Sequence, residues 1–268
     1  MGSGIAQVVA ASGDEVLLND VDAARVERGV EIIAKNLDRA VEKGKMSPEQ
    51  RGKVLSHIDP RPRWESFDVD LAIEAATENE EIKFDLFRRL DESTPPTAVL
   101  ASNTSSISIT RLAAQTSRPG RVIGMHFMNP VPVMRLVEII RGIATSQETF
   151  QYVDALAKRY GKTPVEVRNF PGFVSNRVLC PMLNEAIYTV YEGVGSVESI
   201  DTVMKLGMNH PMGPLELADF IGLDTLLAIM NVLYEGFKDP KYRPCPLLQE
   251  YVDAGWFGRK SGRGFYTY

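Results

Sequence analysis

The sequence of 268 residues lacks the features of several protein classes. It has only two cysteines, Cys180 and Cys245, in apolar surroundings and without the spacing of metal ligands. We therefore expect neither a disulfide framework nor a bound metal. The cysteine usage favours a reducing compartment. No apolar run approaches the roughly 20 residues that cross a bilayer, and no signal peptide is recognisable. These absences predict a cytoplasmic protein without membrane association.

The chain also lacks an excess of positive charge. Its formal net charge is -5, which argues against a general nucleic-acid binder because such a protein presents a basic face. The hydrophobic content of 44% and charged content of 24% are those of an ordinary globular protein. The length favours one large domain or two smaller ones.

Short apolar segments alternate with helical patterns over the first 169 residues. Such alternation is typical of a mostly parallel sheet with helices on both faces, an α/β domain of Rossmann type. The expected strands are 15–20, 70–75, 99–102, 122–127, 136–140 and 164–167. The expected helices are 5–11, 23–45, one starting near 47–50, one through 83–90, one from about 110, and 147–160.

The pattern changes near Asn169-Phe170-Pro171. From Phe173 onward, wide apolar faces recur at helical spacing and no strand alternation is convincing. We therefore predict two domains, residues 1–169 and an all-helical domain of residues 170–268.

The N-terminus carries part of a dinucleotide-binding pattern. Gly2 and Gly4 stand at a helix start, and Asp20 follows Gly2 by 18 residues at the end of a strand. Helix amides would face a pyrophosphate, and the acid would bind a ribose, favouring NAD over NADP. The complete pattern begins with a strand and two further glycines, and we expect these parts to be missing from this sequence. The alternatives are glycines that allow tight packing, and Asp20 as a helix cap.

One of the three histidines stands out. His57 lies in a polar, proline-flanked stretch and His210 in a turn between helices, whereas His126 lies near the end of an apolar strand. Glu138 stands in the middle of the next apolar strand, where a buried carboxylate needs a partner that His126 would supply. The alternative is a solvent-facing Glu138 on an edge strand.

Six motifs along the whole chain resemble the 3-hydroxyacyl-CoA dehydrogenases, most closely the short, monofunctional bacterial type that acts on 3-hydroxybutyryl-CoA. The motifs are Ala75-Ala76-Thr77-Glu78-Asn79, Ser102-Asn103-Thr104-Ser105-Ser106, His126-Phe127-Met128-Asn129-Pro130-Val131-Pro132, Asn184-Glu185-Ala186, Pro211-Met212-Gly213-Pro214 and Gly262-Arg263-Gly264-Phe265-Tyr266. The resemblance implies NAD-dependent interconversion of a 3-hydroxyacyl-CoA and a 3-oxoacyl-CoA.

The resemblance also implies roles for individual residues. His126 would be the general base and Glu138 its orienting partner, while Ser105 and Asn176 would position substrate. Histidine suits proton transfer because its ordinary pKa, about 6.5, lies near working pH. The remaining cofactor contacts implied are Glu78, Lys83, Asn103, Ser105, Asn129 and Lys260.

A basic helix follows the first strand and offers an anion-binding surface. The resemblance implies that Asn36, Lys43 and Lys45 contact coenzyme A, whereas charge runs of this kind are often only a solvated face. It further implies a homodimer through the helical domain. Two alternatives stay open: a catalytically silent or truncated paralogue that keeps the fold and dimer surface, and a dehydrogenase of a 3-hydroxy acid without CoA.

Overall fold

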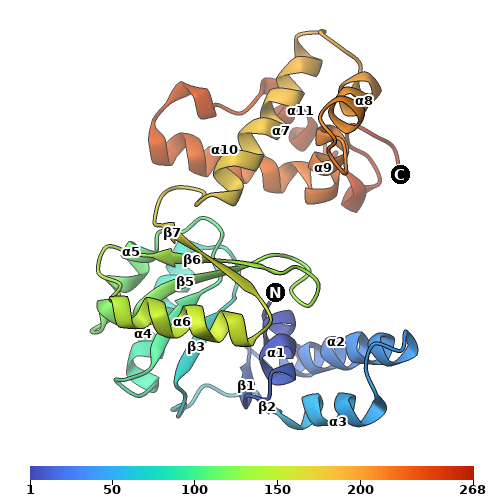
Figure 1. The fold of residues 1–268 in the computed structure, drawn as a ribbon. Coiled ribbons are helices and arrows are strands. Elements are labelled where there is room, and N and C mark those ends of the chain that lie inside the picture. The colour runs from blue at the N-terminus through green and yellow to red at the C-terminus, as the bar shows by residue number, and fades with distance from the viewer. The chain divides into compact units, whose positions relative to one another are not determined.

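The computed structural model describes all 268 residues, which form two compact units, Met1–Asn169 and Phe170–Tyr268. The N-terminal unit combines strands and helices, and the C-terminal unit is helical (Figure 1). The fold class predicted from the sequence, a Rossmann-type domain followed by an all-helical domain, is therefore confirmed.

A five-stranded sheet forms the centre of the N-terminal unit, in the order β3-β4-β5-β6-β7. Its members are β3 (Leu71–Glu74), β4 (Val99–Ser102), β5 (Val122–Phe127), β6 (Leu136–Arg141) and β7 (Thr163–Arg168). Three of the four pairings are parallel, and β5 and β6 run antiparallel with His126 directly opposite Glu138. All six residues of β5 are buried, as its apolar sequence predicts for a central strand.

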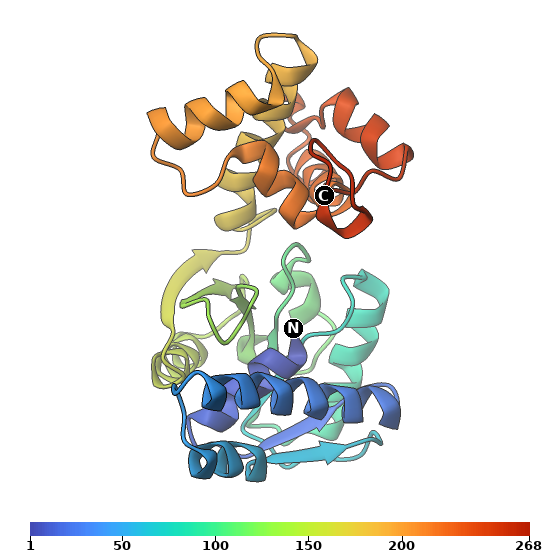
Figure 2. The same cartoon turned by 90° about the vertical axis from the view of Figure 1, so that its right-hand side faces the viewer.

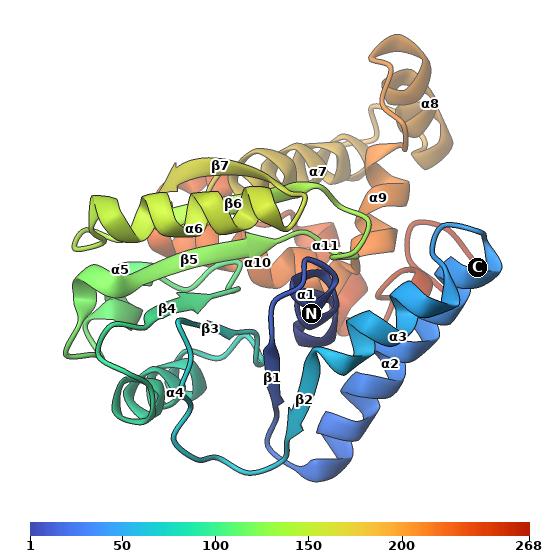
Figure 3. The ribbon, with the colours of Figure 1, turned by 60° about the horizontal axis from the view of Figure 1, so that its bottom comes forward.

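A second, two-stranded sheet pairs β1 (Val16–Asn19) with β2 (Ile58–Arg61), in parallel. Figure 3 shows these two strands side by side and apart from the larger sheet. We did not predict β2, because its sequence Ile-Asp-Pro-Arg shows no apolar alternation and contains proline. Pairing with β1 rather than local propensity makes this segment a strand.

Helices flank both sheets: α1 (Gly2–Ala11), α2 (Ala23–Glu42), α3 (Pro48–Ser56), α4 (Glu80–Ser93), α5 (Ile109–Ala113) and α6 (Gln147–Arg159). Side-chain caps define several of their starts. Asp22 accepts a hydrogen bond from the Arg25 amide, and Ser47 and Gln50 form a capping box. Buried Ile33 and Leu37 of α2 share one apolar cluster with Ala6 and Ala10 of α1.

The C-terminal unit contains five α-helices: α7 (Ser175–Tyr191), α8 (Val197–Gly207), α9 (Pro214–Ile221), α10 (Leu223–Phe237) and α11 (Pro246–Asp253). They are the tan, orange and red helices of Figure 2. Their core includes fully buried Leu183, Ile187, Leu226 and Met230. No single helix is long and apolar enough to span a membrane; α9 and α10, bent by 96° at their junction, pass that test only as a pair.

Two buried aspartates fasten the C-terminal segment to this unit. Asp219 of α9 accepts hydrogen bonds from the amides of Phe265 and Tyr266, at 3.0 and 2.9 Å. Asp201 of α8 accepts one from the Tyr266 hydroxyl at 2.8 Å. A methyl group at Gly264 would overlap the Asp219 carboxylate, so glycine is required where the segment passes it.

Candidate functional site

A histidine and a glutamate meet in the middle of the larger sheet. The Nδ1 atom of His126 lies 2.8 Å from the Oε2 atom of Glu138, and both residues are buried. Residues directly opposite each other on antiparallel strands point to the same face, which brings the two side chains together. Because β7 covers the outer side of β6, the alternative of a solvent-facing Glu138 on an edge strand is wrong.

The hydrogen bond decides which nitrogen of His126 can act as a base. An ionised carboxylate only accepts hydrogen bonds, so the proton of a neutral imidazole lies on Nδ1, facing Glu138. The Nε2 atom then keeps its lone pair for proton transfer. A carboxylate behind the ring also stabilises the imidazolium that forms when Nε2 takes a proton.

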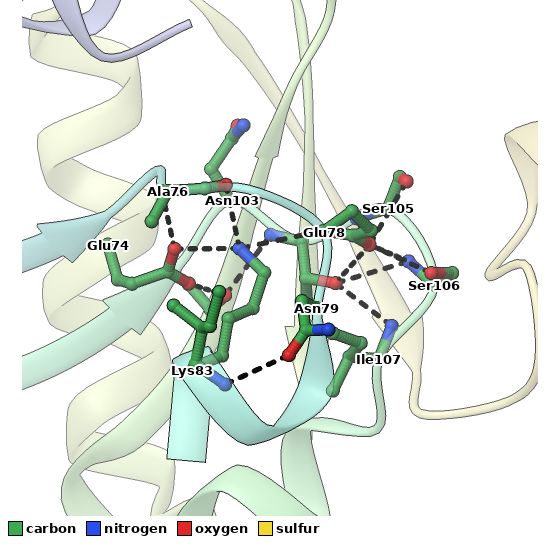
Figure 4. Close-up of polar contacts among 12 residues, drawn as sticks. Glu74, Ala76, Glu78, Asn79, Lys83, Asn103, Ser105, Ser106 and Ile107 are labelled. Carbon is green, nitrogen blue, oxygen red and sulfur yellow. Dashed lines mark hydrogen bonds and ion pairs between the residues drawn. The ribbon is translucent and has the colours of Figure 1, made fainter. Parts of the chain in front are cut away.

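The loop after β4 is held by Glu78, which was among the predicted cofactor contacts. Its Oε1 atom accepts hydrogen bonds from the Thr104 hydroxyl at 2.6 Å and from the amides of Ser105 and Ser106 at 2.9 and 3.0 Å (Figure 4). Burial raises the pKa of Glu78, but the Thr104 hydrogen bond, the Lys83 charge and the Ser106 and Ser105 donors together hold it below its usual range. The carboxylate is therefore ionised and fixes the position of Ser105.

Lys83 lies beneath this loop rather than on its surface. Its side chain is 1% exposed and its Nζ atom donates to Glu74 Oε1 at 2.6 Å and to the Ala76 carbonyl at 3.2 Å. Sequence reasoning missed Glu74, although it stands in an apolar strand as Glu138 does. The rule that a buried acid needs a partner would have found it.

Asn103 comes directly after β4 and contacts the end of β5, and Asn129 comes shortly after β5. The Asn103 side-chain oxygen accepts from the Phe127 amide at 2.9 Å, and the main-chain amide of Asn103 donates to the Glu74 main-chain carbonyl at 2.8 Å. Asn129 is exposed in the turn after β5. Lys162, another residue that sequence reasoning missed, supports this turn by donating to the carbonyls of Val131 and Met134 at 2.5 and 2.9 Å.

The start of α1 fits the pyrophosphate of a dinucleotide. No side chain caps this helix and no acid lies in its first turn, so its first amides and its dipole are available to an anion. A methyl group at Gly2 would meet nothing closer than 3.9 Å, whereas one at Gly4 would meet the Cβ atom of Val131 at 3.0 Å. Tight packing therefore explains Gly4, and Gly2 leaves open space.

Asp20 is exposed directly after β1, where an acid that binds ribose is expected. Its Oδ1 atom accepts only from the adjacent Val21 amide, at 2.7 Å. The cap of α2 is Asp22, so the alternative of Asp20 as a helix cap is wrong. The uncapped helix, Gly2 and Asp20 together suit NAD.

The other predicted ligand contacts lie on surfaces. Lys43 and Lys45 are exposed after α2 and make no ion pair within the chain, while the Asn36 amide donates to Gln7 at 3.2 Å. In the C-terminal unit, Asn176 lies in the first turn of α7 and Lys260 pairs with Asp224. No cluster of three or more His, Cys, Asp or Glu side chains could hold a metal ion.

Comparison with known proteins agrees with this geometry. Residues 1–170 match the family model for the NAD-binding domain of 3-hydroxyacyl-CoA dehydrogenase, and residues 172–268 match the model for its C-terminal domain. A Bacillus subtilis protein described as a probable 3-hydroxybutyryl-CoA dehydrogenase is 60% identical over all of this chain and 94% of its own length. A 3-hydroxybutyryl-CoA dehydrogenase of Bradyrhizobium diazoefficiens is 57% identical over all of this chain and 92% of its own.

Among solved structures, the (S)-3-hydroxybutyryl-CoA dehydrogenase of Ralstonia eutropha is similar over the whole of this chain and 95% of its own, with a TM-score of 0.98 and 52% identity. Both the sequence matches and the structural match extend across the N-terminal and C-terminal units. The chain therefore belongs to the 3-hydroxyacyl-CoA dehydrogenase family.

Proposed function

We propose that this protein is an NAD-dependent dehydrogenase that interconverts 3-hydroxybutyryl-CoA and acetoacetyl-CoA. The observation that carries the chemistry is the buried His126–Glu138 pair, with 2.8 Å between Nδ1 and Oε2. The substrate class rests on relatives up to 60% identical whose names specify 3-hydroxybutyryl-CoA.

His126 performs the proton transfer. Nε2 takes the proton of the 3-hydroxyl group while the hydride on C3 leaves, and the negative charge of Glu138 stabilises the resulting imidazolium. In the reverse direction the imidazolium returns the proton to the developing alkoxide. Ser105, on the loop held by Glu78, donates a hydrogen bond to the 3-oxygen, and Asn176 helps to position the substrate.

Bound NAD supplies the hydride acceptor. The uncapped amides at the start of α1 and the open space at Gly2 bind its pyrophosphate, and Asp20 accepts hydrogen bonds from its adenosine ribose. Glu78, Asn103 and Asn129 line the nicotinamide half, with Lys83 supporting them from below. Lys260, a residue of the C-terminal unit, is a further proposed cofactor contact.

Coenzyme A binds along the basic helix in this proposal. Lys43 and Lys45 are exposed and unpaired within the chain, so their charges are available to the phosphates of CoA. Asn36 adds a hydrogen bond. We also propose a homodimer, because α8 and the turn after it expose Val203, Leu206 and Met208 at 58%, 83% and 61%. We propose a cytoplasmic location, because the free cysteines Cys180 and Cys245 suit a reducing compartment.

The test is oxidation of NADH followed at saturating acetoacetyl-CoA or free acetoacetate. We expect rapid oxidation with the thioester and little with the free acid. Equal rates with the two would overturn the assignment of a CoA substrate and favour a dehydrogenase of a free 3-hydroxy acid. Failure of the protein to bind NADH in a fluorescence titration would overturn the activity altogether and favour a silent paralogue.

A further inference from the structure

Glu74 is a buried carboxylate, and both of its oxygens accept hydrogen bonds. Its side chain is 2% exposed at the end of β3. Oε1 accepts from the Ala76 amide and from Lys83 Nζ, both at 2.6 Å, and Oε2 accepts from the Ser102 hydroxyl at 2.6 Å (Figure 4). These close donors satisfy both oxygens of the buried carboxylate.

Lys83 stands between two carboxylates. Besides Glu74 and the Ala76 carbonyl, its Nζ atom faces Glu78 Oε2 at 3.5 Å. A buried ammonium must keep a counter-ion, because an unpaired charge there is costly. Glu74 is the closer partner by 0.9 Å, the difference between 3.5 and 2.6 Å.

Because Glu78 lies farther from Lys83 than Glu74 does, it can accept hydrogen bonds from the loop of residues 104–106. While Oε2 faces Lys83, Oε1 accepts from three consecutive residues, Thr104, Ser105 and Ser106. Glu74 also acts on the loop from the other side, because the Ser102 hydroxyl that donates to it accepts from the Thr104 amide at 3.1 Å. Both routes lead to the segment that carries Ser105.

We propose that Glu74 is a positioning residue for the reaction: by neutralising Lys83 it lets Glu78 hold the loop of residues 104–106, and so places Ser105. Without the charge of Glu74, the nearest carboxylate to Lys83 is Glu78, which turns toward the ammonium and releases the loop amides. The effect of Glu74 on the loop is argued from these contacts alone, whereas its effect on catalysis rests on the proposed function.

The first experiment measures the loop directly, by hydrogen exchange of the Ser105 and Ser106 amides in full-length wild type and Glu74→Gln. Gln keeps the shape of Glu74 but removes its charge. We expect about tenfold faster exchange at these two amides. Exchange of the Asn103 amide, which donates to the Glu74 main chain, should stay unchanged and report an intact fold. Unchanged exchange at Ser105 and Ser106 would overturn the proposal.

The second experiment separates positioning from simple structural damage. We expect Glu74→Gln to lower kcat for acetoacetyl-CoA reduction about tenfold with NADH affinity retained, and the charge-balanced variant Glu74→Gln/Lys83→Met to be faster than Glu74→Gln alone. A double variant that loses the product of both single effects would overturn the proposal. Glu92→Gln, which changes an exposed carboxylate on α4, the helix that carries Lys83, is the matched control and should behave as wild type.

The two experiments also distinguish this proposal from the proposed function. A wild-type protein inactive toward acetoacetyl-CoA, with loop exchange nevertheless faster in Glu74→Gln, would overturn the function and support the role of Glu74 in holding the loop. An active wild type, with loop exchange and kcat unchanged in Glu74→Gln, would support the function and overturn the role of Glu74.

Discussion

The charged residues at the ends of the larger sheet differ from those around β1 and α2. Glu74, Lys83, His126 and Glu138 are buried and hydrogen-bonded to one another in two groups. Asp20, Lys43 and Lys45 are exposed and form no ion pair within the chain, and the Asp20 carboxylate accepts only from the Val21 amide. Buried charges require partners inside the protein, whereas exposed charges are available for partners outside it.

This contrast predicts where substitution affects catalysis or folding and where it affects only binding. A change in the buried groups should act on the rate or on stability. A change in the exposed groups should act on the affinity for one ligand. Six substitutions test this division.

The largest effect is expected for Glu138→Gln. Without the carboxylate behind His126, the imidazolium loses its stabilisation, and kcat should fall about 10²- to 10⁴-fold. NADH oxidation with acetoacetyl-CoA measures it. Glu166→Gln, on the neighbouring strand β7 and exposed, is the control and should keep the wild-type rate. A Glu138→Gln variant as fast as this control would remove Glu138 from the mechanism.

Lys83→Met should have the largest effect on folding. It leaves Glu74 buried without its counter-ion, which costs about 3–5 kcal/mol in the free energy of unfolding. Denaturant titration measures this. Lys158→Met breaks an exposed pair with Asp154 and should cost below about 1 kcal/mol. Equal losses in the two variants would contradict the distinction between buried and exposed charges.

Asp20→Asn should weaken NADH binding about tenfold, because hydrogen bonds to a charged acceptor are lost. Fluorescence titration gives the dissociation constant, and kcat at saturating NADH should change little. Asp22→Asn makes the same charge change two residues away and keeps a good helix cap, so its NADH affinity should match wild type. Equal weakening in both variants would indicate a general charge effect.

Lys43→Ala and Lys45→Ala should each raise KM for acetoacetyl-CoA by a few-fold, about 1 kcal/mol or less, because exposed charge pairs are weak. The effect should shrink as salt is added, since salt screens exposed charges. Lys53→Ala, on α3, is the control and should leave KM unchanged. A loss that salt does not alter would argue against an electrostatic contact with CoA.

The smallest effect concerns acid pH. The pKa of Glu78 is lowered in the folded protein, so its stabilising contribution is complete above its ordinary pKa, near 4.5, and is lost as pH falls through the folded value. The difference in unfolding free energy between wild type and Glu78→Gln should therefore be largest near neutral pH and shrink in acid. Glu81→Gln, exposed in the first turn of the following helix α4, should show no such pH dependence.

The sequence predicted the buried parts better than the exposed ones. The strands that carry His126 and Glu138 were predicted with nearly their observed bounds, because continuous apolar runs indicate central strands. The same reasoning was not applied to Glu74, and its pairing with Lys83 was missed. Strand β2 could not be predicted, since only pairing with β1 makes its Ile-Asp-Pro-Arg segment extended.

Most of the exposed ligand contacts carried no local signal. Asp20 followed from its spacing after Gly2, but nothing in the spacing of Asn36 or Lys43 distinguishes a binding residue from an ordinary surface residue, and the assignment of these two came from resemblance to a family. The structure adds that Asp22 rather than Asp20 caps α2, and that Gly4 rather than Gly2 is required for packing. Both facts leave Asp20 and Gly2 available for a ligand.

The most direct test of the account is a single-turnover measurement of hydride transfer from bound NADH to acetoacetyl-CoA, in wild type and His126→Gln. We predict that both proteins bind NADH with similar affinity and that the variant transfers hydride about 10²- to 10⁴-fold more slowly. Transfer at the wild-type rate by His126→Gln, with NADH bound, would contradict the central claim that the buried His126–Glu138 pair moves the proton.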